Sequence, residues 1–190
     1  TAELHEFLRS SGFRNVHRLR RAVDTSLFRP ALRDPNLRSE WGLERDDLAV
    51  LHVGRLAPEK NLDLAVRAFA AIRERHRRAR MVVVGDGPSR ATMAGSHPGI
   101  VFAGMRRGED LARHYASGDL FLFPSLTETF GNVTLEALAS GLPVIAFDYG
   151  AAREHVRADD AGWCAPAGDE AAFVRAAVDL ADRLQGEDAA

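Results

Sequence analysis

Short apolar runs alternate with segments of helical spacing from residue 48 to the end of the chain. Each run is four to six residues long and does not alternate between polar and apolar positions. Runs of this kind are typical of strands that are buried on both faces. The pattern predicts six strands, at residues 48–53, 81–84, 100–103, 120–123, 144–147 and 162–165.

Helices are predicted between these strands. The clearest has apolar residues at i, i+3, i+4 and i+7 from Leu62 onward, and Asn61 is placed to cap it. A second helix, at residues 133–139, follows the opener Asn132 and ends at Gly141. Other helices are predicted at residues 89–96, 108–117, 151–156 and 169–184. Ahead of the first strand we expect helices at residues 2–10 and 34–41 and a strand at residues 16–20.

The alternation of buried strands with helices predicts a doubly wound α/β fold. It consists of a parallel sheet of about six strands with helices on both faces. In such a sheet, ligands bind at the carboxyl ends of the strands, near the point where the strand order reverses. The segments that directly follow the strands are therefore the candidate sites.

Composition and charge restrict the function classes. The 190 residues have the length of one domain, taken as residues 1–190, and a formal net charge of −2 does not favour nucleic acid as a partner. Cys164 is the only cysteine, which excludes an intrachain disulfide and fits a reducing compartment. No apolar run has the ~20 residues that cross a bilayer. We expect a cytoplasmic location. Because the chain begins at Thr1 rather than Met, we also expect a fragment of a longer protein.

Two cations follow the first strand. Arg55 comes directly after Gly54, and Lys60 stands just before the next helix and is the only lysine among 25 Lys and Arg residues. Because free amides and the helix dipole favour an anion at a helix start, the predicted partner is a phosphate or diphosphate. The alternative is that Arg55 is a solvated loop residue and that Lys60 pairs with Glu59 or Asp63.

The stretch after the fourth strand carries two carboxylates, Glu128 and Glu136. Between them, the backbone amides from Phe130 to Val133 lie at a predicted helix start and could bind hydroxyl or phosphate oxygens. Glu136 could accept hydrogen bonds from two vicinal hydroxyls, as on a ribose, and Glu128 from a second polyol. The alternative is that Glu136 is an exposed helix residue and that Glu128 favours the helix dipole.

Other classes of site find less support. The fingerprint G-x-G-x-x-G does not follow the first strand, which counts against a nicotinamide or flavin dehydrogenase. His52 is interpreted as a buried histidine of the core or of the strand end. His17, His114 and His155 lack a metal-ligand spacing with Asp, Glu or Cys, and no metal site is predicted.

Several of these motifs occur together in an order that resembles a known family. The set comprises Gly54-Arg55-Leu56 with Glu59-Lys60-Asn61, the segment 82–88, Phe102-Ala103-Gly104, and Glu128-x7-Glu136. It resembles the C-terminal, nucleotide-sugar-binding domain of family 4 retaining glycosyltransferases of the GT-B fold, over about residues 22–166. The likeness is strongest to hexosyltransferases, including mannosyltransferases, of lipid and glycan assembly.

The resemblance implies a role for each candidate residue. Arg55 and Lys60 would bind the donor diphosphate and stabilise charge on the departing nucleotide. Glu136 would hold the ribose hydroxyls, and Glu128 would face the donor sugar. The other implied donor-binding positions are Gly54, Met105 near the base, and the amides of Phe130, Gly131, Asn132 and Val133.

The same resemblance implies the partners of the chain. They are a nucleotide-sugar donor of the GDP-mannose or UDP-glucose type, an N-terminal acceptor domain outside this chain, and a glycan or lipid acceptor. No cofactor or metal would be required, and membrane contact would come from the absent domain, at the inner face of the membrane.

One departure from the family pattern is that Arg21-Ala22 stands where the family has Asn-Gly before Val23-Asp24. Two alternatives stay open: a non-catalytic nucleotide-sugar sensor and a nucleotide-sugar epimerase of the GT-B fold.

Overall fold

A single parallel sheet forms the centre of the computed structural model, which describes residues 2–17, 22–127, 131–156 and 161–187. The strand order is β3-β2-β1-β4-β5-β6, so chain order reverses between β1 and β4. This order confirms the predicted doubly wound sheet and locates its switch point. The strands are β1 (Ala49–Val53), β2 (Arg80–Val84), β3 (Val101–Gly104), β4 (Leu120–Phe123), β5 (Val144–Phe147) and β6 (Gly162–Ala165).

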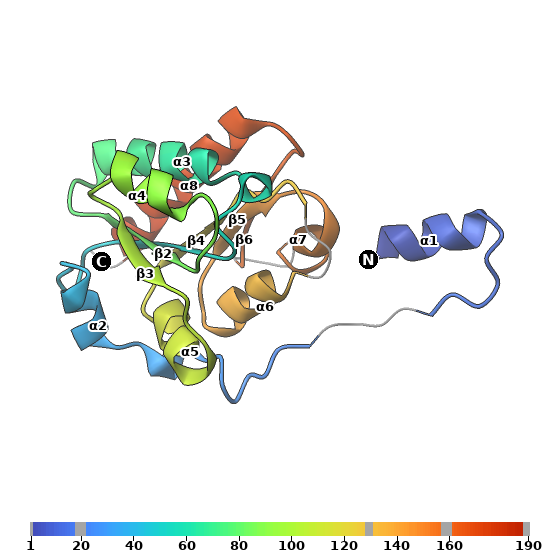
Figure 1. Ribbon diagram of the computed structural model, residues 1–190, viewed down its shortest axis with the longest axis horizontal. Helices are drawn as coiled ribbons and strands as arrows, with labels where there is room; N and C mark the ends of the chain where they lie inside the picture. The colour runs from blue at the N-terminus through green and yellow to red at the C-terminus, as the bar shows by residue number, and fades with distance from the viewer. Residues whose placement is uncertain (1, 18–21, 128–130, 157–160, 188–190) are drawn as a thin grey trace.

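Helices cover both faces of the sheet, as predicted (Figure 1). One face packs against α3 (Leu62–Arg75), α4 (Arg90–Ser96) and α8 (Glu170–Glu187). The other face packs against α2 (Pro35–Glu40), α5 (Gly108–Ala116), α6 (Asn132–Ala139) and α7 (Gly150–His155). The first helix, α1 (Ala2–Ser10), lies away from the sheet, and two short 3-10 turns occupy Pro30–Leu32 and Pro58–Lys60.

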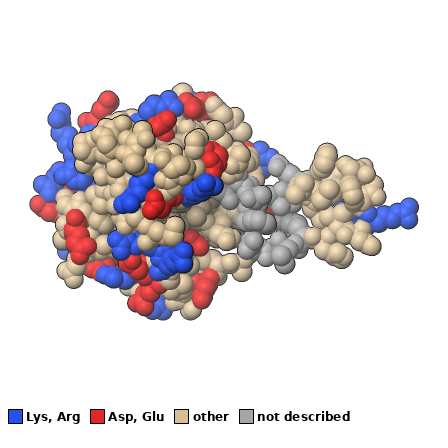
Figure 2. Space-filling model, viewed as in Figure 1, with Lys and Arg blue, Asp and Glu red and all other residues tan. Residues whose placement is uncertain are grey.

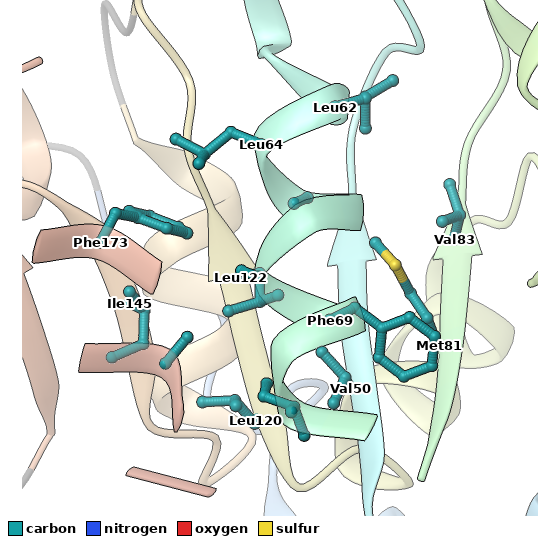
Figure 3. Packing of buried hydrophobic residues seen from close by; sticks show 14 of the residues in the cluster. Val50, Leu62, Leu64, Phe69, Met81, Val83, Leu120, Leu122, Ile145 and Phe173 are labelled. Carbon is teal, nitrogen blue, oxygen red and sulfur yellow. The ribbon is translucent and has the colours of Figure 1, made fainter. Parts of the chain in front are cut away.

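Alternate residues of each strand supply the two halves of the core. In β1, Val50 points to the α3 and α8 face, whereas Leu51 points to the opposite face. Figure 3 shows the first half, in which Phe69 of α3 lies against Met81 of β2 and Phe173 of α8 lies near Ile145. Because β1, β4 and β5 are buried along their whole length, they read as continuous apolar runs.

An ion pair between buried Arg38 and partly buried Asp119 attaches the segment before β1 to the sheet. Arg38 of α2 donates to Asp119 at 2.8 Å and to the carbonyl of Ser117 at 2.8 Å. The same carboxylate accepts from the backbone amide of Ala49 at 2.7 Å. Residues on both sides of the switch point are therefore joined at the amino ends of β1 and β4, opposite the edge where ligands bind.

The structure differs from the predictions at two helix starts and one strand. Asn61 has the left-handed conformation, with φ of 51°, and its side chain makes no capping hydrogen bond to α3. A capping side chain reaches the free amides from an extended backbone, which Asn61 does not have. Before α6 the cap position is held by Gly131, with φ of 66°, and Asn132 is the first helical residue. Val16 is not in a strand, and residues 18–20 of that prediction lie outside the described ranges.

Candidate functional site

The loops that follow β1 and β4 meet at the carboxyl edge of the sheet. The backbone amide of Leu126, after β4, donates to the carbonyl of Glu59, after β1, at 3.1 Å. The ammonium Nζ of Lys60 donates to Ser125 Oγ at 3.3 Å and to the carbonyl of Thr127 at 3.4 Å. It also lies 5.7 Å from the centre of the Phe123 ring. The predicted cation therefore stands at the switch point, where the two loops come together.

The loop after β1 is held by its neighbour after β2. The amide of Gly54 donates to the carbonyl of Val84 at 3.0 Å, and the amide of Leu56 donates to the carbonyl of Asp86 at 2.9 Å. Gly85 has φ of 135°, and a Cβ atom at this position would lie 1.9 Å from the carbonyl oxygen of Gly54. The two loops approach this closely because Gly85 has no side chain.

Arg55 does not reach the loop after β4 in the described contacts. Its side chain is 68% exposed and lies 3.9 Å from Glu59. An exposed pair at this distance contributes little to stability. Among the described residues, Lys60 contacts the second loop and Arg55 does not, and Arg55 occupies the solvated position that the alternative interpretation describes.

The start of α6 presents backbone amides on the same side. Thr134 and Leu135 donate their amides to the carbonyl of Gly131, each at 3.1 Å. Among the described residues, the amides of Asn132 and Val133 have no hydrogen-bond acceptor, as is usual for a first helical turn. Glu128 and Phe130 lie outside the described residues, so their predicted roles stay predictions.

Glu136 is half-buried on α6 rather than exposed. Its Oε2 atom accepts a hydrogen bond from the hydroxyl of Tyr115, on α5, at 3.0 Å. Burial raises the pKa of the Glu136 carboxyl, and the hydrogen bond from Tyr115 opposes that rise. Within the described ranges, Lys, Arg and His side chains make no ion pair with it.

Met105 follows β3 and is 58% exposed, with Arg107 3.6 Å from its sulfur atom. Its position at the carboxyl edge is the one expected, but no described contact links it to Lys60 or Glu136.

Charged side chains of both signs are interspersed over the face shown in Figure 2. In the described part of the chain, no group of three His, Cys, Asp or Glu residues could hold a metal ion. A helix with the length and hydrophobicity of a membrane span is likewise not found there.

Two site residues were not identified from the sequence as parts of a site. Tyr115 was not singled out, although a tyrosine within an apolar helix face must place its hydroxyl against a partner. Ser125 is buried, contacts Lys60, and donates to the carbonyl of Thr127 at 2.9 Å. No pattern distinguishes it from other loop serines, because its role depends on β1 and β4 being neighbours.

His52 is fully buried, as interpreted from the sequence. Its Nδ1 is 2.9 Å from the carbonyl oxygen of Leu122, which assigns the proton to Nδ1, and Nε2 has no hydrogen-bond partner among the described residues. Burial, followed by the charge of Lys60, lowers the pKa of His52 to about 4. The imidazole is therefore neutral at pH 7 in the folded chain.

His52 should make the free energy of unfolding fall as the pH is lowered. Between pH 6.5 and pH 4 the unfolded chain binds a proton at this histidine and the folded chain does not, so stability is retained above pH 6.5 and lost as pH falls. The free energy of unfolding should fall by about 2 kcal/mol from this residue by pH 5. Urea denaturation of wild type and His52→Gln at pH 7 and pH 5 measures the difference. The exposed His17→Gln serves as control, and equal pH dependence in wild type and His52→Gln would contradict the assignment.

The family model for group 1 glycosyl transferases matches residues 47–183, which is more than half of the chain. The chain belongs to this family. The match includes both loops of the site and the half-buried Glu136. The match agrees with the glycosyltransferase family that the motifs of the sequence resemble.

The chain matches less than half the length of each of three similar proteins with curated names. A GDP-mannose-dependent alpha-mannosyltransferase of Mycobacterium tuberculosis is 42% identical over 166 residues, which cover 86% of this chain and 42% of the relative. A second of that name, from Mycolicibacterium smegmatis, is 43% identical over 74% of this chain and 36% of the relative. The sulfoquinovosyl transferase of Arabidopsis thaliana is 37% identical over 75% of this chain and 28% of the relative.

Solved structures of other proteins share the fold of this chain. The sucrose-phosphate synthase of Thermosynechococcus elongatus superposes with a TM-score of 0.73 at 23% identity, over 98% of this chain and 51% of that one. The C-terminal domain of a group 1 glycosyl transferase from Francisella tularensis gives a TM-score of 0.64 at 21% identity, over 85% of this chain and 97% of that one. The predicted GT-B type of fold is confirmed.

Proposed function

We propose that this chain is the donor-binding domain of a retaining glycosyltransferase. The full enzyme would move a hexose from a nucleoside-diphosphate sugar to a glycan or lipid acceptor in the cytoplasm, with an N-terminal domain supplying the acceptor site. The observation that carries the proposal is the ammonium group of Lys60 at the switch point, in contact with both Ser125 and Thr127. Several mannosyltransferases among the relatives are named for GDP-mannose, which makes it the first donor to test.

Lys60 is suited to the donor diphosphate. It presents a compact ammonium at the point where the two loops meet, within reach of Ser125 and Thr127, and an ammonium is a common partner of phosphate. The amides of Asn132 and Val133, at the positive end of the α6 dipole, would add donors for the same phosphates. As the bond between sugar and diphosphate breaks, negative charge grows on the leaving phosphate, and Lys60 would stabilise that charge.

The other site residues take the remaining parts of the donor in this proposal. Glu136 would accept hydrogen bonds from the ribose, because a carboxylate has acceptor capacity for two vicinal hydroxyls. Arg55 would turn from its contact with Glu59 to the diphosphate. Met105 would lie near the base, and Glu128 with the amides around Phe130 near the sugar. The chemistry requires no metal, because cationic side chains and amides balance the phosphate charge.

Thermal denaturation of this chain with nucleoside diphosphates tests the proposal. GDP, UDP and ADP should be tried at millimolar concentration, each beside its nucleoside. The matching nucleoside diphosphate should raise the melting temperature. At a hundredfold excess over Kd, it should add about 2.7 kcal/mol to the free energy of unfolding. The nucleoside alone should give a smaller shift, because Lys60 recognises phosphate. Unchanged melting with all three diphosphates would reject the donor pocket.

Product analysis of the two-domain protein separates the remaining possibilities. A retaining transferase gives a glycosylated acceptor with the anomeric configuration of the donor. An epimerase gives an altered sugar without an acceptor, and a sensor gives no product.

A further inference from the structure

The hydrogen bond between Tyr115 and Glu136 links a fully buried side chain to a half-buried carboxylate. Tyr115 lies on α5 and Glu136 on α6, and the hydroxyl is 3.0 Å from Oε2. Tyr115 has no exposed surface. A buried hydroxyl is costly to desolvate unless it has a partner, and here the described partner is a single carboxylate oxygen.

The ring of Tyr115 is fixed from two sides. It meets Phe28 edge to face, with ring centres 5.8 Å apart and an interplanar angle of 77°. It also packs against Phe121 of β4, at 5.8 Å and 57°. Both contacts are typical aromatic geometries that hold a ring in one orientation. The hydroxyl therefore has a fixed position relative to the sheet.

Glu136 would otherwise be poorly constrained. A glutamate side chain has three rotatable bonds, and its rotamer freedom is among the largest of all residues. The hydrogen bond to Tyr115 fixes Oε2, while Oε1 has no hydrogen-bond donor among the described residues. The carboxylate thus keeps one oxygen for an external donor and is oriented by the other.

We propose that Tyr115 is a positioning residue that holds Glu136 in the orientation needed to accept from the ribose hydroxyls of a nucleotide. Tyr115 itself touches no ligand and acts through Glu136. This inference rests on the proposed function, because it takes the ribose as the partner of Glu136. Its physical basis is preorganisation: a carboxylate that is already oriented loses less freedom when the nucleotide binds.

The Tyr115→Phe variant tests this role because it removes only the hydroxyl and keeps the aromatic packing. Binding of GDP, UDP and ADP to this chain should be compared with binding of their 2′,3′-dideoxy analogues by calorimetry. The wild type should prefer the ribonucleotide. In Tyr115→Phe the ribonucleotide should bind about tenfold more weakly, because binding must then immobilise the glutamate side chain, while dideoxynucleotide affinity stays the same. A purely structural loss would weaken both nucleotides equally.

Two further variants complete the experiment. Tyr149→Phe is the matched control, because Tyr149 is the only other tyrosine and donates to the carbonyl of Ser125 at 3.2 Å. It should leave the ratio between the two nucleotides unchanged. Glu136→Ala should abolish the ribose preference, and adding Tyr115→Phe to it should cause no further loss, because both act through one contact.

The outcomes distinguish the two levels of inference. If the wild type binds none of the nucleotides, the proposed function fails and this inference fails with it. If Glu136→Ala abolishes the ribose preference and Tyr115→Phe retains it, the donor site stands and the role of Tyr115 is rejected. If the double variant loses more than Glu136→Ala alone, Tyr115 acts by another route and the inference is also rejected.

Discussion

Replacement of Lys60 by alanine should reduce kcat/KM of the two-domain enzyme by about 10²–10³-fold, the usual cost of removing one group that stabilises charge in a transition state. Lys60 is the only lysine in the chain and contacts both loops at the switch point. Lys60→Arg should recover little of the activity, because a planar guanidinium does not fit the place of a compact ammonium. Steady-state kinetics with saturating acceptor measures the effect.

Arg67→Ala provides the matched control for the loss of one positive charge. Arg67 lies on α3, pairs with Glu170 of α8 at 2.6 Å, and has no described contact with the site. Its replacement should leave kcat/KM unchanged. A folded Lys60→Ala enzyme that keeps a third or more of wild-type kcat/KM would overturn the role given to Lys60.

Replacement of Gly85 by alanine should destabilise the fold by about 3 kcal/mol, at the upper end for overpacking by a single methyl group. The new Cβ would lie 1.9 Å from the carbonyl oxygen of Gly54, and φ of 135° is strained for any residue with a side chain. The clash is between Cβ, whose position the backbone fixes, and backbone atoms of Gly54, so it cannot be relieved by a change of rotamer. Urea denaturation at pH 7 measures the loss.

Gly95→Ala is the control for this substitution. Gly95 is exposed in α4, and an added Cβ would meet nothing within 4 Å. Because alanine is favoured over glycine within a helix by ~0.5–1 kcal/mol, this variant should be more stable than wild type. The change in the free energy of unfolding should therefore be negative for Gly85→Ala and positive for Gly95→Ala. A urea midpoint of Gly85→Ala equal to that of wild type would contradict the close approach of the two loops.

The sheet could be predicted from the sequence because each strand is a short, largely apolar run, although His52 lies within β1 and Arg80 begins β2. All six strands and the helices between them occur within a residue or two of their predicted positions. The topology added the neighbour relation of β1 and β4, which brings Lys60 to Ser125 across 65 residues of sequence. Sequence reasoning identified the lysine but could not name its serine partner.

The capping residues were harder to predict because backbone conformation, not residue type, determines them. Asparagine is a common helix cap, yet Asn61 has a left-handed backbone and its side chain makes no capping hydrogen bond to α3. At α6 the cap position is held by Gly131, which adopts φ of 66° easily because it has no side chain. It therefore caps the helix without the polar side chain that a sequence pattern looks for. The role of Tyr115 was missed for a related reason: a helical pattern records that a residue is buried, not what its hydroxyl meets.

The contact between the loops after β1 and β4 also determines how the site is lost. Its two halves are distant in sequence and are joined by the bond from Leu126 to Glu59 and by Lys60. Neither half can form alone, because each is positioned by a strand that needs the other strand beside it. The site should therefore disappear in the same cooperative transition as the central sheet, and a bound donor would protect β1 and β4 together.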